Sequence, residues 1–436
     1  MIWLFFMTIV WLLLLLLVGC YDLPVAGNQS QTVTRVILAT FVAGFLYLLL
    51  FFVFGRPAIL VGEPPEPGLT LFDLSLPPRL IPGLLVLLGV PLLIVWRLSY
   101  IQFFTSPAMR RHAVIVGSSS SGSALVHDTR SATKDYEFVG FIDEDPALWG
   151  TNVQGLKVMG NYDVLTQLIK AREVDEVIVA LPKSVEGELF QALIYCHERG
   201  TTIRSMSKVY EEVLGQVPVE HLGSYWFLDG STSNFPIIYR ACKRLVDISV
   251  GLIGLAILAL LFPWIAIAIY LDSPGPLFYR QERHGQYGKR FWVLKFRSMI
   301  PDAEKVGLEK LGLDRWTEKD DPRVTRVGRL LRRARFDELP QVINILKGDM
   351  SLVGPRPEVS RMVESLDRQI PFYRLRWSIK PGLTGWAQVC YRYGSTIEDA
   401  LVKLKYDLYY IKHQSLRLDL LIIFRTIAVV LAFRGS

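Results

Sequence analysis

The chain has 436 residues, which is enough for two or three domains. Hydrophobic residues make up 51% and charged residues 20% of the sequence, so part of the chain is expected to lie in lipid, and intrinsic disorder is excluded as the main state. The net charge of +7 suits anionic headgroups or phosphorylated substrates and is too diffuse to indicate nucleic acid.

Three uncharged apolar stretches open the chain: residues 2–19, 36–54 and 80–96. At about 1.5 Å per residue each is about 25–29 Å long, close to the hydrocarbon thickness of a bilayer. We therefore expect residues 1–105 to form a transmembrane helical bundle, with a cleaved signal peptide as the alternative for the first stretch. Arg97, Arg110 and Arg111 follow the third stretch, which predicts that its C-terminal end faces the cytoplasm.

Residues 106–210 have the pattern of a soluble α/β domain. Buried strands are expected at HAVIVG (112–117), FVGFIDED (138–145) and VDEVIVALP (174–182). Because helical segments separate these runs, the pattern predicts a parallel, Rossmann-like sheet.

A possible nucleotide loop follows the first of these strands. Gly117, Ser119 and Gly122 stand where a G-x-G-x-x-G loop has its glycines, with serine replacing the middle one, and Asp143 stands at about the ribose-binding distance along the chain. The loop could hold a phosphate at a helix N-terminus, or it could be a tight turn that binds nothing. The sequence leaves both interpretations open.

Residues 211–240 are predicted to be a connector, and the apolar stretch that follows contains Pro263. A fourth transmembrane helix is one interpretation of this stretch. We favour a re-entrant helix over about 245–271, because it keeps the Rossmann-like domain and the basic C-terminal region on the same, cytoplasmic side. The apolar tail that begins at Leu416 is expected to be an interfacial amphipathic helix, or else a buried core helix.

A run of arginines precedes the most informative part of the sequence. They recur at every third position: Arg323, Arg326, Arg329, Arg332 and Arg335. Since an α-helix has 3.6 residues per turn, positions three apart drift by about 60° per step and are expected to wrap around a helix.

The next stretch, FDELPQVINILKGD, has apolar residues at helical spacing and a helix stop at Lys347-Gly348. Asp337 stands at the expected N-cap. A carboxylate there could simply cap the helix, or it could be held ionised and attack a phosphorus atom while Glu338 holds a divalent cation. Spacing alone leaves these roles open.

Several motifs resemble those of the bacterial sugar transferases, the monotopic polyprenyl-phosphate hexose-1-phosphate transferases: KRLVD, SPGPLFYRQERHGQYGKRFWVLKFRSM, RFDELPQVINILKGDMSLVGPRPE and KPGLTGWAQV. The resemblance runs from about residue 241 to 436 and implies a mostly helical monotopic catalytic domain with a re-entrant helix. Together with the membrane helices and the Rossmann-like domain, it is similar to the large members that initiate exopolysaccharide, capsule or O-antigen synthesis.

The resemblance also implies residue roles. It makes Asp337 the nucleophile and Glu338 its dyad partner, with Mg²⁺ bound at the dyad. Pro263 matches the helix-breaking proline of the re-entrant helix. The remaining matches are basic residues expected to surround the active site or, for the last, to contact the nucleotide sugar: Lys295, Arg297, Arg332 and Arg356.

The implied reaction moves hexose-1-phosphate from a UDP-sugar to undecaprenyl phosphate, releasing UMP, through a covalent Asp337 intermediate. Glucose and galactose are both open as the sugar. The implied location is the bacterial inner membrane with the catalytic domain on the cytoplasmic face, in contact with membrane lipids, and the implied assembly is a homodimer.

Two departures accompany the resemblance. Phe262 replaces the serine that precedes the proline in small members, and three rather than four apolar stretches precede the Rossmann-like domain. Two other functions remain as alternatives: a membrane-anchored nucleotide-sugar dehydratase or epimerase, and a non-catalytic scaffold for glycosyltransferases.

Overall fold

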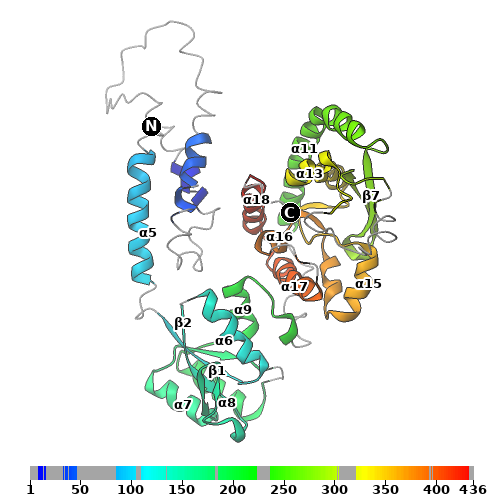
Figure 1. Ribbon diagram of the computed structural model, residues 1–436. Coiled ribbons are helices and arrows are strands. Elements are labelled where there is room, and N and C mark those ends of the chain that lie inside the picture. Colours follow the sequence, from blue (N-terminus) through cyan, green and yellow to red (C-terminus); the bar gives the residue numbers. More distant parts are fainter. Residues whose placement is uncertain are drawn as a thin grey trace, which may run out of the picture. The chain divides into compact units, whose positions relative to one another are not determined.

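The structure is a computed structural model (Figure 1). It describes residues 8–15 except 13, 33–46 except 34 and 38, 85–104, 110–181 except 134, 185–222, 236–303 except 302, 321–391, 394 and 396–431. The chain divides into two compact units, the first comprising Met1–Leu181 and Val185–Ser205, the second Pro182–Ser184 and Met206–Ser436.

The N-terminal apolar region is described only in part. Its helical pieces include Arg35–Leu46, the π-helix η1 (Leu85–Gly89) and α5 (Val90–Phe104). The indole of Trp11 donates a hydrogen bond to the Thr40 hydroxyl at 3.0 Å, which links two of the apolar stretches. The described pieces are each shorter than a membrane span, so the three predicted spans stay predictions.

The first unit contains a six-stranded sheet in the order β3-β4-β2-β1-β5-β6. Its strands are β1 (Arg111–Val116), β2 (Tyr136–Ile142), β3 (Asn152–Val153), β4 (Leu156–Gly160), β5 (Glu176–Val179) and β6 (Thr202–Ser205). All neighbouring strands run parallel except the β3–β4 pair at one edge. This doubly wound order confirms the predicted Rossmann-like sheet.

Three helices connect these strands: α6 (Ser120–Ala132), α7 (Tyr162–Ala171) and α8 (Gly187–Glu198). The apolar run of β1 is fully buried, as are Val177 and Ile178 of β5. Helices α7 and α8 pack against this core through Leu165, Leu189 and Cys196. Continuous apolar strands are expected where helices cover both faces of a parallel sheet.

The second unit begins with α9 (Met206–Leu214) and the 3₁₀ turn η4 (Val219–His221). Glu211 of α9 is buried, and its carboxylate accepts hydrogen bonds from Lys412 at 2.9 Å and His413 at 2.8 Å. Much of the predicted connector therefore packs inside the second unit, and residues 223–235 lie outside the described part.

The rest of the second unit is mostly helical with two small sheets. Its helices are α11 (Ile237–Asp272), α13 (Arg326–Arg333), α14 (Val342–Lys347), α15 (Ser360–Gln369), α16 (Trp386–Cys390), α17 (Ile397–Lys412) and α18 (Leu416–Leu431), with 3₁₀ turns η5 (Gln286–Gly288), η6 (Phe336–Gln341) and η7 (Tyr373–Ser378). The hairpin β7 (Phe278–His284) and β8 (Arg290–Phe296) is antiparallel, and β9 (Ser351–Val353) pairs in parallel with β10 (Gly382–Thr384).

Helix α11 is the one helix in the described part of the chain that is long and apolar enough to cross a membrane. It contains Pro263 and is bent (Figure 1), and its outward side chains are largely exposed. A straight helix of 36 residues would be about 54 Å long. Near its start, however, Arg244 binds the carbonyls of Ile345 and Leu346, and at its end Asp272 accepts from the Val327 amide. Both ends of α11 are therefore fixed to the same folded unit.

The C-terminal helix α18 is partly a core helix and partly apolar on its surface. Asp419 is buried and receives hydrogen bonds from Lys243 at 3.0 Å and Tyr410 at 2.5 Å, while Ile422 is fully buried. Ile427 is exposed. The Asp419 side chain, one of the charged groups in the apolar tail, therefore points into the protein. There it connects α18 to Lys243 near the start of α11.

Candidate active site

The predicted dyad lies in η6, between α13 and α14. Arg335, directly before η6, has a left-handed backbone (φ 60°, ψ 16°), which ends α13 and turns the chain. Asp337 is the second residue of η6, so its predicted N-cap position is wrong. The α-helix begins only after Pro340, which lacks an amide hydrogen. Gly348 (φ 90°) ends α14, as predicted.

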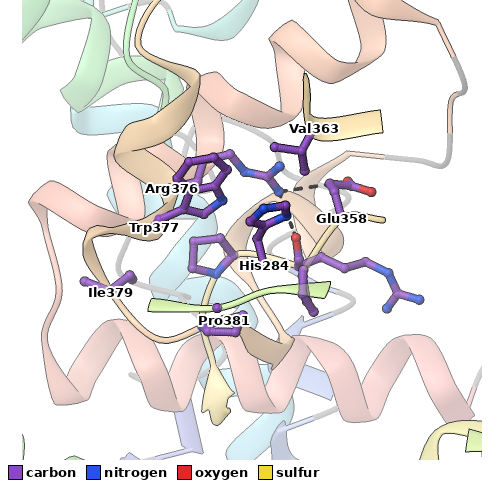
Figure 2. A pocket seen from close by; sticks show the side chains of 11 residues that line it. His284, Glu358, Val363, Arg376, Trp377, Ile379 and Pro381 are labelled. Carbon is purple, nitrogen blue, oxygen red and sulfur yellow. Dashed lines mark hydrogen bonds and ion pairs between the residues drawn. The ribbon is translucent and has the colours of Figure 1, made fainter. Parts of the chain in front are cut away.

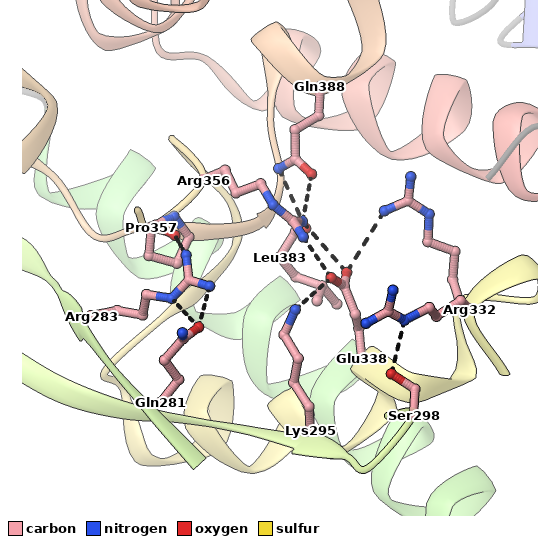
Figure 3. A network of polar contacts seen from close by, with 11 residues as sticks. Gln281, Arg283, Lys295, Ser298, Arg332, Glu338, Arg356, Pro357, Leu383 and Gln388 are labelled. Atoms are coloured by element: carbon pink, nitrogen blue, oxygen red, sulfur yellow. Dashed lines mark hydrogen bonds and ion pairs between the residues drawn. The ribbon is translucent and has the colours of Figure 1, made fainter. Parts of the chain in front are cut away.

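Glu338 is buried among basic side chains (Figure 3). Its Oε1 accepts from Arg356 Nη2 at 2.6 Å and from Lys295 Nζ at 3.0 Å, and its Oε2 lies 3.9 Å from Arg335 Nη1. Burial raises the pKa of Glu338, but Arg356, Lys295 and Arg335 outweigh it and hold the pKa well below its usual range. Glu338 is therefore an ionised centre that fixes three cations.

Asp337 lies beside this cluster, but its pKa is shifted in the opposite direction. Burial and the neighbouring Glu338 carboxylate raise the pKa of Asp337, and Lys295, Arg332 and Arg356 oppose that rise. Within the described residues the Asp337 carboxylate accepts no hydrogen bond and forms no ion pair. Of the two carboxylates, Asp337 is thus the one with oxygen atoms left for a substrate.

Lys295 reaches the dyad from β8, where it pairs across the hairpin with Tyr279. Asn344 of α14, which is buried, fixes this strand: its Oδ1 accepts from the Leu294 amide at 3.2 Å and its Nδ2 donates to the Trp292 carbonyl at 2.8 Å. The amide side chain thereby completes the edge of β8 as a neighbouring strand would. Asn344 links the helix that follows the dyad to the strand that carries Lys295.

We expect Asn344→Leu to lower the free energy of unfolding by about 1–3 kcal/mol, because β8 loses both hydrogen bonds to the Asn344 amide. We also expect lower transferase activity, because the strand that carries Lys295 is then less firmly held. Chemical denaturation and activity assays would measure both effects. Gln369→Leu, which removes an exposed amide bonded only within α15, is the matched control. Wild-type stability of the Asn344 variant would contradict this role.

Arg332 points to the dyad from the last turn of α13. Its Nε donates to the Ser298 hydroxyl at 2.9 Å, and burial lowers the pKa of its guanidinium while Asp337 counters that effect. Arg326, Arg329 and Arg333 of the same helix are exposed. Three members of the predicted series, Arg326, Arg329 and Arg332, lie on α13, and Arg332 is the one at the site. The prediction of one helix for all five is wrong, because Arg323 precedes α13 and pairs with Asp321, and Arg335 follows it with a left-handed backbone.

Arg297 has different contacts from those that the resemblance implies. Its guanidinium is buried and donates to the carbonyls of Ser273 and Pro274, at the C-terminal end of α11. Cations stabilise the carbonyl-rich ends of helices. In the structure Arg297 therefore acts on the α11–β7 connection.

We expect Arg297→Met to lower the free energy of unfolding by about 1–3 kcal/mol while the folded fraction keeps a near-normal KM for the nucleotide sugar. The reason is that Arg297 holds helix-end carbonyls. Thermal unfolding and steady-state kinetics would separate these effects, with Lys295→Met as the comparison that raises KM or lowers kcat. A variant of normal stability with a large loss in kcat/KM would return Arg297 to the active site.

Arg356 joins the dyad to a residue that the sequence did not single out. Its Nη1 donates to Gln388 Oε1 at 3.1 Å, and Gln388 in turn donates weakly to the Leu383 carbonyl at 3.4 Å (Figure 3). Gln388 lies in the quoted motif KPGLTGWAQV, but no spacing rule connects that motif to Arg356. The structure thus brings Lys295, Arg332 and Arg356 to the dyad.

The glycine-rich turn of the first unit is built as a close-packed loop. A side chain at Gly117 (φ +104°) would press on Leu181, and one at Gly122 would overlap the Gly117 carbonyl. Ser119 precedes α6 without a side-chain cap, and the Asp143 carboxylate accepts from the Ser118 amide at 2.8 Å and hydroxyl at 2.5 Å. These contacts lower the pKa of Asp143 against the effect of burial. Packing explains both glycines without a ligand, and Asp143 already has partners.

The dyad has the donor chemistry for Mg²⁺. Mg²⁺ commonly takes one or two carboxylates and completes its shell with water and substrate phosphates. Asp337 and Glu338 are adjacent carboxylates, and the described residues contain no group of three acidic, histidine or cysteine side chains that would form a fuller site. An ion at this dyad would therefore depend on substrate phosphates for further ligands.

The sequence of the chain matches two protein-family models. The model of the bacterial sugar transferase family matches residues 238–433, and a CoA-binding domain model matches residues 79–207.

Several relatives align with about two thirds or more of the chain. An Aeromonas hydrophila protein named UDP-N-acetylgalactosamine-undecaprenyl-phosphate N-acetylgalactosaminephosphotransferase is 36% identical over 308 residues, covering 70% of this chain and 69% of that protein. UDP-glucose:undecaprenyl-phosphate glucose-1-phosphate transferases from Xanthomonas campestris and Escherichia coli are 35% and 33% identical and cover 64% and 73% of this chain, or 57% and 67% of their own lengths. With the dyad and its cations in the matched region, the chain belongs to the bacterial sugar transferase family.

Proposed function

We propose that this enzyme transfers a hexose-1-phosphate or N-acetylhexosamine-1-phosphate from a UDP-sugar to undecaprenyl phosphate, as the initiating step of exopolysaccharide, capsule or O-antigen synthesis. The names of its relatives support the two substrates, and these names differ in the sugar. The observation that carries the proposal is the pairing of Glu338, saturated by cations, with Asp337, which has free carboxylate oxygens.

The dyad supports a two-step, ping-pong reaction. In the first step an Asp337 oxygen attacks the phosphorus atom bonded to the sugar, the bond to the bridging oxygen breaks, and UMP leaves with that electron pair. In the second step an oxygen of undecaprenyl phosphate attacks the same phosphorus atom and the Asp337 carboxylate leaves. The products are UMP and undecaprenyl-diphosphate-sugar.

The surrounding cations suit a diphosphate. Lys295, Arg332 and Arg356 interact electrostatically with Asp337, so they would neutralise the negative charge of a donor approaching it. Mg²⁺ held at the dyad would add further charge neutralisation; Asp337 has oxygen atoms for it, whereas Glu338 would share the ion only by giving up a contact with Arg356 or Lys295. Fixed cations in a partly buried site need no reorganisation as charge develops on the leaving phosphate.

The long apolar helix supports a membrane location. Because both ends of α11 are fixed to one unit, the bent helix is best explained as re-entrant, entering one leaflet and returning at Pro263. This arrangement would hold the dyad at headgroup depth, within reach of a lipid-linked phosphate and a soluble nucleotide sugar. We assign the enzyme to the bacterial inner membrane with this unit on the cytoplasmic face; the homodimer implied by the resemblance stays a prediction.

A direct assay tests the reaction. The purified full chain in detergent would be given undecaprenyl phosphate, Mg²⁺ and a panel of UDP-hexoses and UDP-N-acetylhexosamines, and UMP release would be measured. We expect lipid-dependent multiple turnover with at least one donor. NAD-dependent conversion of a UDP-sugar without lipid would instead support the dehydratase or epimerase alternative, which the occupied Asp143 disfavours.

A further inference from the structure

Two arginines bind consecutive carbonyl groups of the loop that carries Arg356. Arg376 Nη2 donates to the Arg356 carbonyl at 3.0 Å, and Arg283 Nη1 donates to the Pro357 carbonyl at 2.6 Å (Figure 3). They come from separate elements, Arg376 from η7 and Arg283 from β7. We name this pair the arginine clamp.

The backbone of this loop can be held mainly through its carbonyl groups, because two of its residues are prolines. Pro355 and Pro357 flank Arg356 and have no amide hydrogen to donate. The Pro355 carbonyl accepts from the Gly382 amide at 2.9 Å, so three consecutive carbonyls are bound from outside the loop. Removing one of these donors frees the backbone beside the side chain that binds Glu338.

Arg376 is held rigidly from several sides. It is only 7% exposed, and it donates to Asp407 at 2.8 Å and to the Tyr373 hydroxyl at 2.7 Å, with the Glu358 carboxylate 4.0 Å away. Burial raises the pKa of Asp407 to about 6, and the Arg376 guanidinium opposes that rise. The guanidinium is thus fixed before it reaches the Arg356 carbonyl.

Arg283 is fixed within its own strand. The Gln281 Oε1 atom accepts from its Nε at 3.1 Å and from its Nη2 at 2.5 Å, leaving Nη1 for the Pro357 carbonyl. Burial lowers the pKa of Arg283, and Glu358 counters that effect. Glu358 therefore interacts electrostatically with both members of the clamp.

The pocket beside Arg376 does not offer a substrate site of its own. It is lined by His284, Glu358 and Trp377 among others (Figure 2), and its cavity volume of about 10 Å³ has room for no more than one water molecule. The His284 ring stacks on Trp377 with centroids 5.1 Å apart, which fills the space between β7 and η7. Side-chain packing therefore fills the space behind Arg376, and the clamp contacts the Arg356 loop on its other side.

We propose that Arg283 and Arg376 are positioning residues that act through the backbone of Arg356 to aim its guanidinium at the dyad. The kinetic test of this inference rests on the proposed function, whereas the structural argument for it does not. Neither clamp residue is within ion-pair distance of Asp337 or Glu338 in the described structure, so neither is assigned a catalytic role.

A double-mutant cycle tests the proposal. Arg283→Met keeps much of the packing volume and leaves no buried carboxylate without its direct partner. We expect it to lower kcat/KM for the UDP-sugar by about 10- to 100-fold with a small change in melting temperature. In the Arg356→Ala background it should have no further effect, because the two residues act through one group.

Two variants support this cycle. Arg376→Lys keeps a charge for Asp407 but loses the planar fork, and we expect the same non-additivity with Arg356→Ala. Arg374→Met is the control, because it removes an exposed arginine that lies two residues before Arg376 and pairs with Asp367; it should leave kcat/KM unchanged. Additive losses, or a fully active Arg283→Met or Arg356→Ala variant, would overturn the proposal.

Hydrogen–deuterium exchange supplies a readout independent of activity. We expect faster exchange in a peptide covering residues 350–360 of Arg283→Met, with unchanged exchange in α17. If the wild type transfers no sugar phosphate, the proposed function fails and this exchange decides the positioning role by itself. Unchanged exchange in 350–360 would then overturn it.

Discussion

Asp337→Ala is expected to reduce UMP release by at least about 10³-fold while the protein keeps its fold. Asp337 is the carboxylate of the dyad without a hydrogen-bond partner in the described structure, so its removal deletes the nucleophile and breaks no ion pair. Steady-state UMP release and the melting temperature would be measured side by side.

The matched control for this variant is Glu364→Ala, which removes an exposed carboxylate on α15. It should keep wild-type activity. Equal UMP release by wild type and Asp337→Ala would remove Asp337 as nucleophile. Absence of UMP release from both proteins would instead support the alternative of a non-catalytic scaffold.

Glu338→Gln should reduce kcat/KM by about 10²-fold and lower the free energy of unfolding by about 1–3 kcal/mol. Glutamine has nearly the same shape but no charge, so Lys295, Arg335 and Arg356 lose the centre that holds them together. Kinetics and chemical denaturation would measure the two effects.

Glu198→Gln, at an exposed carboxylate on α8, is the control for that substitution. The account also expects Glu338→Gln and Arg356→Ala to be non-additive, since each removes the same ion pair. A fully active Glu338→Gln enzyme would mean that the cations are positioned without Glu338.

The Rossmann-like sheet was predictable because its strands are short, buried and apolar. The runs at β1, β2 and β5 have few polar residues, and turn and helix signals separate them. The hairpin β7–β8 was missed because β7 is largely charged and half-exposed, while β8 contains consecutive apolar residues, so neither strand shows a polar–apolar alternation in the sequence. The glycines of HGQYGK, where Tyr287 is left-handed, were the available signal for its turn.

The dyad and its cations could be named from the motif, but their contacts could not. Arg297 and Lys295 are two residues apart on one extended segment, yet Lys295 binds Glu338 and Arg297 binds carbonyls at the end of α11. Asn344, Gln388 and the arginine clamp act through long-range hydrogen bonds, which leave no periodicity in the sequence. Arg335 belonged to the predicted series, but its left-handed backbone is set by the turn between α13 and η6.

Exchange of labelled UMP into UDP-sugar, without undecaprenyl phosphate, tests the covalent Asp337 intermediate most directly. The enzyme, Mg²⁺, labelled UMP and the unlabelled donor would be incubated, and label in the UDP-sugar would be measured for wild type and Asp337→Ala. The account predicts exchange by the wild type and none by the variant, because the first step reverses without an acceptor. A wild type that turns over with lipid but shows no exchange would contradict the account and indicate direct transfer between the two substrates.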